Sequence, residues 1–267
     1  MGHASMAVAS MPSHPSRKAA KRGPMPAAPT PEISVVVPVR DEEGAAGPLA
    51  LEIADAFADR PHEIIFVDDA SRDRTRESLA ALKPRLPQLR VLSHTVNAGQ
   101  SRAVRTGVLA ATGAIIVTLD GDGQNDPADA PRLVDALIAG PPGLALVGGR
   151  RLKRQDSSAK RLASRIGNGA RKRILADGAD DTGCGLKAMR REAFLRLPYF
   201  DHMHRYLPAL MLREGYRIAF ETVGHRPRTT GRSKYTNLGR LWVSLSDLAG
   251  VLWLRRRARS PGDISEA

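Results

Sequence analysis

The segment Asp120-Gly-Asp122-Gly-Gln124 places three oxygen-bearing side chains around two glycines. Alternate residues of an extended turn face the same side, so the two carboxylates and the amide oxygen converge. Hard oxygen ligands of this kind suit Mg²⁺ or Mn²⁺, and the glycines let a phosphate approach the backbone closely. An EF-hand does not fit, because no Glu stands at the twelfth position of the loop. The turn therefore predicts a divalent metal–phosphate site with Asp120, Asp122 and Gln124 as ligands.

Polar residues also gather where three earlier apolar segments end. Pro38, Asp41 and Glu42 follow the segment 33–37. Asp68, Asp69, Ser71 and Asp73 follow the segment 63–67. Asn97 and Gly99 follow the segment 89–92. Each of these residues alone also fits a helix cap or a turn. Together with the acidic turn they mark four strand ends in a row, which favours a ligand site. Asp69 is suited to accept hydrogen bonds from a nucleobase or a ribose.

The segments that position these residues alternate between strands and helices. Short β-branched runs predict strands at 33–37, 63–67, 89–92, 114–119 and 144–147, and helical patterns lie at 45–59, 73–84, 100–111 and 128–139. This alternation predicts an α/β fold with a mostly parallel sheet covered on both faces. Ligands of such sheets bind beyond the carboxyl ends of the strands. Later segments predict helices at 159–176, 191–197 and 203–214, and a strand at 217–223.

Charge and composition limit the class of protein. The net charge of +13 favours anionic partners such as phosphorylated substrates, acidic membranes or nucleic acid. A nucleic-acid-binding protein is the weaker alternative, because only 4% of the residues are aromatic and no recognition motif is evident. The chain also lacks a P-loop and a G-x-G-x-x-G after its first strand, which argues against an ATPase and a Rossmann dehydrogenase.

The two ends of the chain differ from its centre. Residues 1–30 predict a solvated Ala/Pro-rich basic tail and no signal peptide, since no apolar run follows the basic residues. Residues 241–254 are apolar but shorter than the roughly 17–25 residues that span a bilayer. Four arginines follow, so the C-terminal segment predicts an amphipathic helix on an anionic membrane surface; packing on the catalytic domain or on a second subunit is the alternative. The predicted organisation is a tail at 1–30, one domain at 31–235 and a helix with a basic tail at 236–267.

Six segments together resemble family 2 glycosyltransferases of the GT-A fold, and within them the dolichyl- and polyprenyl-phosphate mannosyl- or glucosyltransferases. The resemblance covers about residues 32–237. It rests on Val35-Val-Val-Pro-Val-Arg-Asp-Glu42, Val67-Asp-Asp-Ala-Ser-Arg-Asp73, Asn97-Ala-Gly-Gln-Ser-Arg-Ala-Val-Arg-Thr-Gly107, Asp120-Gly-Asp-Gly-Gln-Asn-Asp-Pro127, Asp181-Thr-Gly-Cys-Gly-Leu-Lys-Ala-Met-Arg-Arg-Glu-Ala-Phe194 and His225-Arg-Pro-Arg-Thr-Thr-Gly-Arg-Ser-Lys-Tyr235.

The resemblance implies roles for individual residues. It implies an inverting, metal-dependent transfer of a hexose from a nucleotide sugar, with GDP-mannose and UDP-glucose as the expected donors. Asp122 is the firmest metal ligand. Arg228 and its neighbours would meet the donor diphosphate or the acceptor phosphate. The residues implied to bind the donor are Pro38, Asp41, Glu42, Asp69, Asn97, Asp120, Ser233 and Lys234.

The acceptor distinguishes two mechanisms. A polyprenyl or dolichyl phosphate is already largely ionised at neutral pH, so it needs cationic positioning more than a general base. A hydroxyl of a saccharide or glycolipid would need a base, and Asp181 is the candidate. The leading prediction is a lipid phosphate acceptor, which implies a peripheral enzyme at the cytoplasmic face of a membrane. A homo-oligomer remains open.

Overall fold

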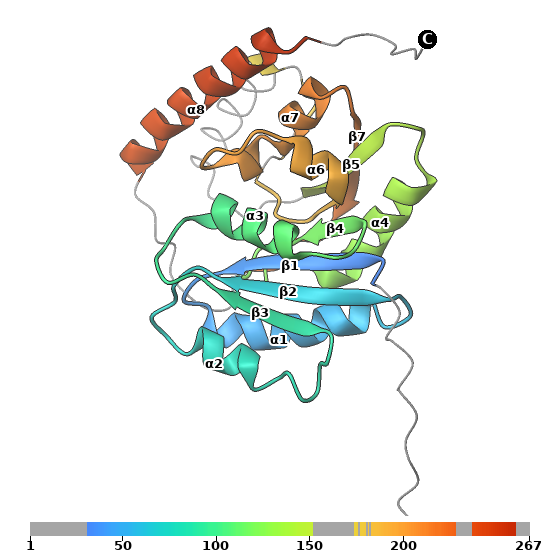
Figure 1. Ribbon diagram of the computed structural model, residues 1–267, viewed down its shortest axis with the longest axis vertical. Helices are drawn as coiled ribbons and strands as arrows, with labels where there is room; N and C mark the ends of the chain where they lie inside the picture. Colours follow the sequence, from blue (N-terminus) through green and yellow to red (C-terminus); the bar gives the residue numbers. More distant parts are fainter. Residues whose placement is uncertain are drawn as a thin grey trace, which may run out of the picture.

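The computed structural model describes residues 31–151, 174–175, 177–179, 181, 183–227 and 237–259. In this part of the chain, seven strands form one sheet in the order β3-β2-β1-β4-β6-β5-β7 (Figure 1). The strands are β1 (Ile33–Val39), β2 (His62–Asp68), β3 (Leu89–Ser93), β4 (Ile115–Thr118), β5 (Leu144–Arg151), β6 (Lys187–Arg190) and β7 (Arg217–Val223). The mostly parallel α/β sheet predicted from the alternating pattern is confirmed.

One strand of the sheet, β6, was not predicted from the sequence. It runs antiparallel between β4 and β5, whereas the other neighbouring strands pair in parallel. The segment is only four residues long, and a strand of that length shows too little alternation to be recognised. Since Lys187 at the start of β6 pairs with Thr118 at the end of β4, the residues just before β6 lie next to the acidic turn.

Helices cover both faces of the sheet, as Figure 1 shows. They are α1 (Glu43–Ala56), α2 (Thr75–Ala80), α3 (Gln100–Ala110), α4 (Ala130–Ala139), α6 (Arg191–Arg196), α7 (Leu207–Arg213) and α8 (Asn237–Arg257), with 3₁₀ turns at Pro127–Asp129 and Met203–Arg205. The helix predicted at 73–84 is shorter, and the one predicted at 203–214 is divided into a 3₁₀ turn and α7 with Pro208 in its first turn. The helix predicted at 159–176 falls almost entirely outside the described residues, as does the tail at 1–30.

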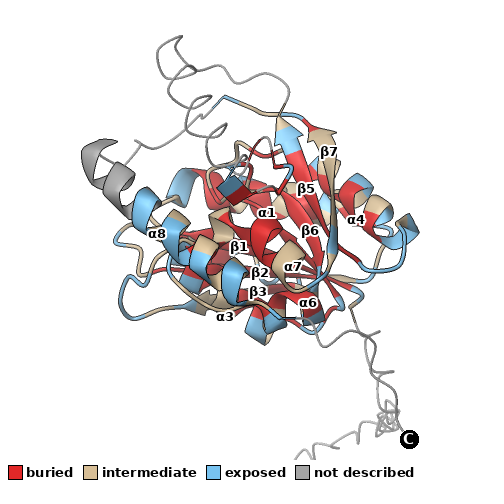
Figure 2. Cartoon of the chain, turned by 90° about the horizontal axis from the view of Figure 1, so that it is seen from above, coloured by how far each residue is buried: buried red, intermediate tan, exposed pale blue. Residues whose placement is uncertain are grey.

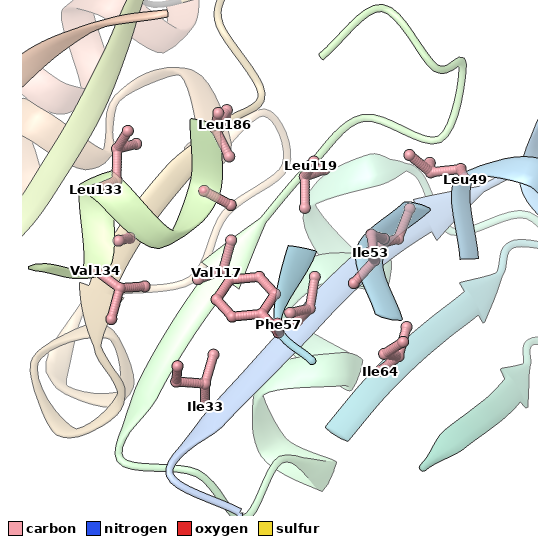
Figure 3. Close-up of a cluster of buried hydrophobic side chains, with 14 of the residues drawn as sticks. Ile33, Leu49, Ile53, Phe57, Ile64, Val117, Leu119, Leu133, Val134 and Leu186 are labelled. Carbon is pink, nitrogen blue, oxygen red and sulfur yellow. The ribbon is translucent and has the colours of Figure 1, made fainter. Parts of the chain in front are cut away.

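Two apolar cores lie on opposite faces of the sheet. Val35 and Ile64 point into the core beneath α1 and α4, whereas Val36 and Ile65 point into the core beneath α3, α6 and α7. Figure 3 shows the first core, with Phe57 between strand and helix residues, and Figure 2 shows buried residues concentrated along the central strands. The central strands β1, β2 and β4 are buried on both faces, which is why they read as continuous apolar runs in the sequence.

Helix α8 packs on the second core. Val251 is fully buried there, and Leu248 and Leu254 are partly buried beside it. The guanidinium of Arg213 on α7 donates to the carbonyl oxygen of Leu254 at 3.1 Å. Leu245 and Trp253 point away from the core, with 50% and 61% of their surface exposed. In the described part of the chain, no helix is both long enough and apolar enough to cross a membrane.

Candidate functional site

The loops after β1 and β2 are joined by hydrogen bonds at the carboxyl edge of the sheet. The backbone N–H of Asp41 donates to Ser71 Oγ at 2.9 Å, and Arg72 N–H donates to the Asp41 carboxylate at 2.7 Å. The backbone N–H of Glu42 donates to Thr75 Oγ1 at 2.8 Å. Asp41 also has a positive φ of 51°, a conformation that non-glycine residues adopt rarely. The predicted nucleotide-pocket residues Asp41 and Glu42 therefore lie in a tightly held loop pair.

Asp69 fastens the loop between β3 and α3. Its buried carboxylate accepts hydrogen bonds from the backbone N–H groups of Ala98 at 2.8 Å and Gly99 at 2.7 Å, and it lies 2.7 Å from His94 Nδ1. Asn97 is exposed on the same loop. The oxygens predicted to receive a nucleobase or ribose are thus engaged by the protein in this structure. The nucleoside contact of Asp69 stays a prediction.

Asp120 lies where three segments meet. Gln100 on α3 donates to Asp120 Oδ1 at 2.8 Å, and Asn125 Oδ1 accepts from the Asp120 backbone N–H at 3.2 Å. A Cβ atom added to Gly185 would lie only 2.3–2.6 Å from the carboxyl atoms of Asp120. Burial and the neighbouring Asp122 carboxylate raise the pKa of Asp120, against the opposing effect of the Lys187 ammonium. The convergence of the Asp120 and Asp122 carboxylates on one metal ion stays a prediction.

The acidic turn rests on the end of β1. A Cβ atom added to Gly121 would lie 2.8 Å from the carbonyl oxygen of Pro38, so the turn passes directly over this residue. Within the turn, Gln124 N–H donates to Asp122 Oδ1 at 3.1 Å. The Gln124 side chain meets the ring of His225, with 3.5 Å between the two Nε2 atoms. The structure therefore places Pro38 against Gly121 and brings Gln124 together with His225, which lies 101 positions later in the chain.

Arg226 and its neighbours hold the segment after β7 against this turn. The Arg226 N–H donates to the carbonyl oxygen of Gln124 at 2.9 Å. Its guanidinium lies 2.6 Å from Glu52 on α1 and 2.9 Å from Asp126. The predicted phosphate contacts Arg228, Ser233 and Lys234 follow this anchored segment but lie outside the described residues. No local pattern in the sequence points to the role of Arg226, because its partners are distant along the chain.

Two cations, the partly buried Arg151 and the buried Lys187, lie close to the candidate site. Arg151 forms a bidentate ion pair with Asp181, with N–O distances of 2.6 and 2.8 Å. Lys187 on β6 donates to the carbonyl oxygen of Cys184, and burial lowers its pKa although Asp120 and Asp181 oppose the shift. Sequence reasoning missed Lys187. The available signal was a lysine flanked by Leu186 and Ala188, which placed a charge in an apolar run.

The oxygen-bearing side chains of the acidic turn fit a divalent metal ion whose coordination is completed by substrate oxygens. Among the residues that the structure describes, no group of three or more His, Cys, Asp or Glu side chains is arranged as a complete metal site. Asp120, Asp122 and Gln124 offer two carboxylates and one amide on one turn, which are oxygen ligands of the kind that Mg²⁺ and Mn²⁺ prefer. Such an ion commonly completes its coordination with substrate phosphates and water.

The motif segments on which the resemblance rests contribute residues to this edge of the sheet, as far as the structure describes them. A family model agrees with the resemblance. A model described as glycosyl transferase family 2 matches residues 34–197. The chain belongs to this family. The match includes the acidic turn and β6, and excludes the segment after β7.

Two curated proteins are similar to this family 2 glycosyltransferase. A dodecaprenyl-phosphate galacturonate synthase of Rhizobium johnstonii is 34% identical over 244 residues, which are 86% of this chain and 69% of that protein. An undecaprenyl-phosphate 4-deoxy-4-formamido-L-arabinose transferase of Yersinia enterocolitica is 35% identical over 210 residues, which are 77% of this chain and 63% of that protein. The chain thus spans about two thirds of the length of these relatives. Neither name mentions mannose or glucose. These relatives therefore do not support the mannosyltransferase-like activity predicted from the sequence.

Solved structures agree on the fold. Glucosyl-3-phosphoglycerate synthase of Mycobacterium tuberculosis, crystallised with Mn²⁺, UDP-glucose and phosphoglyceric acid, has a TM-score of 0.61 and 22% sequence identity. The match covers 87% of this chain and 82% of that one. The predicted GT-A fold is confirmed for this family 2 glycosyltransferase. At this identity the likeness concerns the fold alone.

Proposed function

We propose that this family 2 glycosyltransferase transfers a sugar from a nucleotide sugar to a polyprenyl phosphate. The observation that carries the proposal is the acidic turn, which is held between the strand-end loops and the segment after β7. Gly121 of the turn lies against Pro38, just before Asp41 and Glu42, and Asp120 lies against Gly185, two residues before Lys187. A nucleoside on the Pro38 side would leave its diphosphate over Asp122 and Gln124.

The chain's own residues supply positioning and charge. Asp120, Asp122 and Gln124 would hold Mg²⁺ or Mn²⁺, which when bound neutralises charge on the leaving diphosphate. Gln100 keeps the Asp120 carboxylate in place through its 2.8 Å hydrogen bond. Arg226 fixes the backbone at Gln124. Pro38 and Asn97 border the proposed nucleotide pocket, and Arg228, Ser233 and Lys234 are proposed to meet the phosphates.

The ion pair between Asp181 and Arg151 favours a phosphate acceptor over a hydroxyl acceptor. A general base must reach the proton that it removes. The Asp181 carboxylate is 8% exposed and both of its oxygens bond the Arg151 guanidinium, so it is poorly placed to take a proton. An ionised phosphate acceptor needs no such base and would attack the anomeric carbon directly, with inversion of configuration. Saccharide and glycolipid acceptors are the second candidate.

The sugar is proposed more broadly than mannose or glucose. The similar proteins are named for galacturonate and for a formamido-arabinose, so uronic acids and amino sugars join the candidates. The decisive assay incubates the full chain with Mg²⁺ or Mn²⁺, a short polyprenyl phosphate and each of several labelled UDP- or GDP-sugars. A labelled product that extracts into organic solvent is expected with one of them. Product formed only on saccharide acceptors would replace this proposal by the second candidate.

A peripheral membrane position accompanies this function. A lipid-linked phosphate stays at the bilayer, so the enzyme must reach the headgroup. The exposed side chains of Leu245 and Trp253 lie on α8 just before the exposed Arg256, Arg257 and Arg259. Apolar area next to positive charge is typical of helices that lie in the interface of an anionic membrane. We propose that this face of α8 contacts the cytoplasmic leaflet.

A further inference from the structure

Arg102 and Arg105 on α3 share one aromatic ring outside the candidate active site. The guanidinium carbon of Arg102 lies 3.8 Å from the ring centroid of Tyr199, and that of Arg105 lies 5.4 Å from it. Arg102 is exposed, whereas Arg105 and Tyr199 are half-buried. Tyr199 follows α6 in the chain, so two separate elements build this cluster.

Within the described residues, the two guanidinium groups have no acidic partner. No ion pair in the described part of the chain includes Arg102 or Arg105. The Nη1 atom of Arg105 is buried and has no hydrogen-bond partner there. A buried donor without an acceptor is costly, and two like charges over one ring repel each other. The cation–π contacts with the Tyr199 ring offset only part of this cost.

An oxyanion would neutralise the charge of both groups at once and would accept from their accessible N–H groups. Guanidinium forks bind phosphate oxygens with paired N–H donors, and two forks suit one phosphate group. We propose that Arg102 and Arg105, held against Tyr199, form a phosphate-binding site separate from the acidic turn. The ligand is a phosphate group, carried either by an anionic lipid headgroup or by a soluble phosphate compound.

The position of the cluster links it to the acidic turn and to α8. Gln100, two residues before Arg102, contacts Asp120, and Ser101 Oγ lies 2.7 Å from the Nδ1 atom of His204. The loop that holds Tyr199 also holds His202, whose ring lies 3.2 Å from Asp247 of α8. Phosphate bound to α3 would thus sit on the element that joins the acidic turn to the loop under α8.

The test measures phosphate binding by titration calorimetry on the full chain with saturating nucleoside diphosphate and Mg²⁺. These ligands occupy the proposed donor site, and no step depends on sugar transfer, so the result is independent of the proposed function. The Arg102→Gln/Arg105→Gln variant is expected to bind inorganic phosphate at least tenfold more weakly than the native chain. The control variant Arg76→Gln/Arg85→Gln removes the same charge from exposed positions at and after α2 and is expected to bind normally.

A second variant protects the test against misfolding. Arg102→Lys/Arg105→Lys keeps both charges but loses the paired donors, and it is expected to bind phosphate several-fold more weakly. Sedimentation with phosphatidylglycerol and phosphatidylcholine vesicles then separates the two sources. Weaker binding of the Gln variant to phosphatidylglycerol, relative to the control variant, assigns a lipid headgroup, and unchanged vesicle binding assigns a soluble phosphate compound. Equal phosphate affinity in the native chain and the Gln variant, or equal loss in the control variant, would overturn the site.

Discussion

At the scale of single residues, the space above Gly185 decides where the Asp120 carboxylate lies. Since a Cβ atom at position 185 would come within 2.3–2.6 Å of that carboxylate, Gly185→Ala must displace Asp120 or the backbone. We expect this variant to lose most of its transfer activity and its metal-dependent nucleotide binding. Thermal shift with nucleoside diphosphate and Mn²⁺ is the measurement. Gly143→Ala, at a positive-φ turn with open space and remote from the site, controls for general destabilisation.

Asp122 provides the sharpest test of the metal assignment. Asp122→Ala relieves repulsion between two neighbouring carboxylates, which offsets the lost hydrogen bond from Gln124 N–H, so the free protein should still fold with only a small change in stability. Loss of charge neutralisation at the leaving diphosphate is expected to raise the barrier by several kcal/mol, which would abolish measurable transfer. Thermal unfolding and the organic-extraction assay together distinguish the two effects. A folded Asp122→Ala protein with near-normal turnover would refute the role of Asp122.

At the scale of elements, Glu63 ties four parts of the sheet region together. Its buried carboxylate accepts from Ser34 Oγ on β1, from Thr112 N–H and Oγ1 before β4 (each 2.7 Å), and from Arg90 on β3 at 2.5 Å. Burial by itself raises the pKa of Glu63, but these hydrogen bonds outweigh it and lower the pKa to about 2. The ionised form is therefore the one that the fold stabilises.

The sign of the resulting pH dependence follows from this lowered pKa. The contribution of Glu63 is fully present above about 4.5, its ordinary pKa, and is lost as the pH falls toward about 2. Glu63→Gln is expected to lower the free energy of unfolding by about 2–3 kcal/mol at pH 7. The difference should shrink steadily below pH 4.5, as measured by urea denaturation at several pH values. Glu77→Gln, at an exposed position of α2, should show no such trend.

At the scale of the whole molecule, the net charge of +13 and the exposed apolar side chains of α8 are both expected to favour binding to an anionic membrane. Replacing Leu245 and Trp253 by Ser should leave thermal stability nearly unchanged, because both are exposed, yet reduce flotation with anionic liposomes. Val251→Ser is the matched change on the opposite face of α8: it should reduce stability because Val251 is fully buried. If the Leu245→Ser/Trp253→Ser variant floats as well as the native chain, α8 does not bind the membrane.

The sequence by itself determined the alternating strands and helices, the loops that carry polar residues and the family, because these depend on local periodicity and short motifs. Only the tertiary structure decided that β6 enters the sheet antiparallel, that Gly185 lies against Asp120, and that Arg226 joins Glu52 to the acidic turn. It also showed that Asp69, predicted to contact the nucleoside, and Asp181, the candidate base for a hydroxyl acceptor, both bond protein groups. The physical reason is distance along the chain. Residues 52 and 226 are 174 positions apart, and their contact depends on how whole elements pack, which no local pattern encodes.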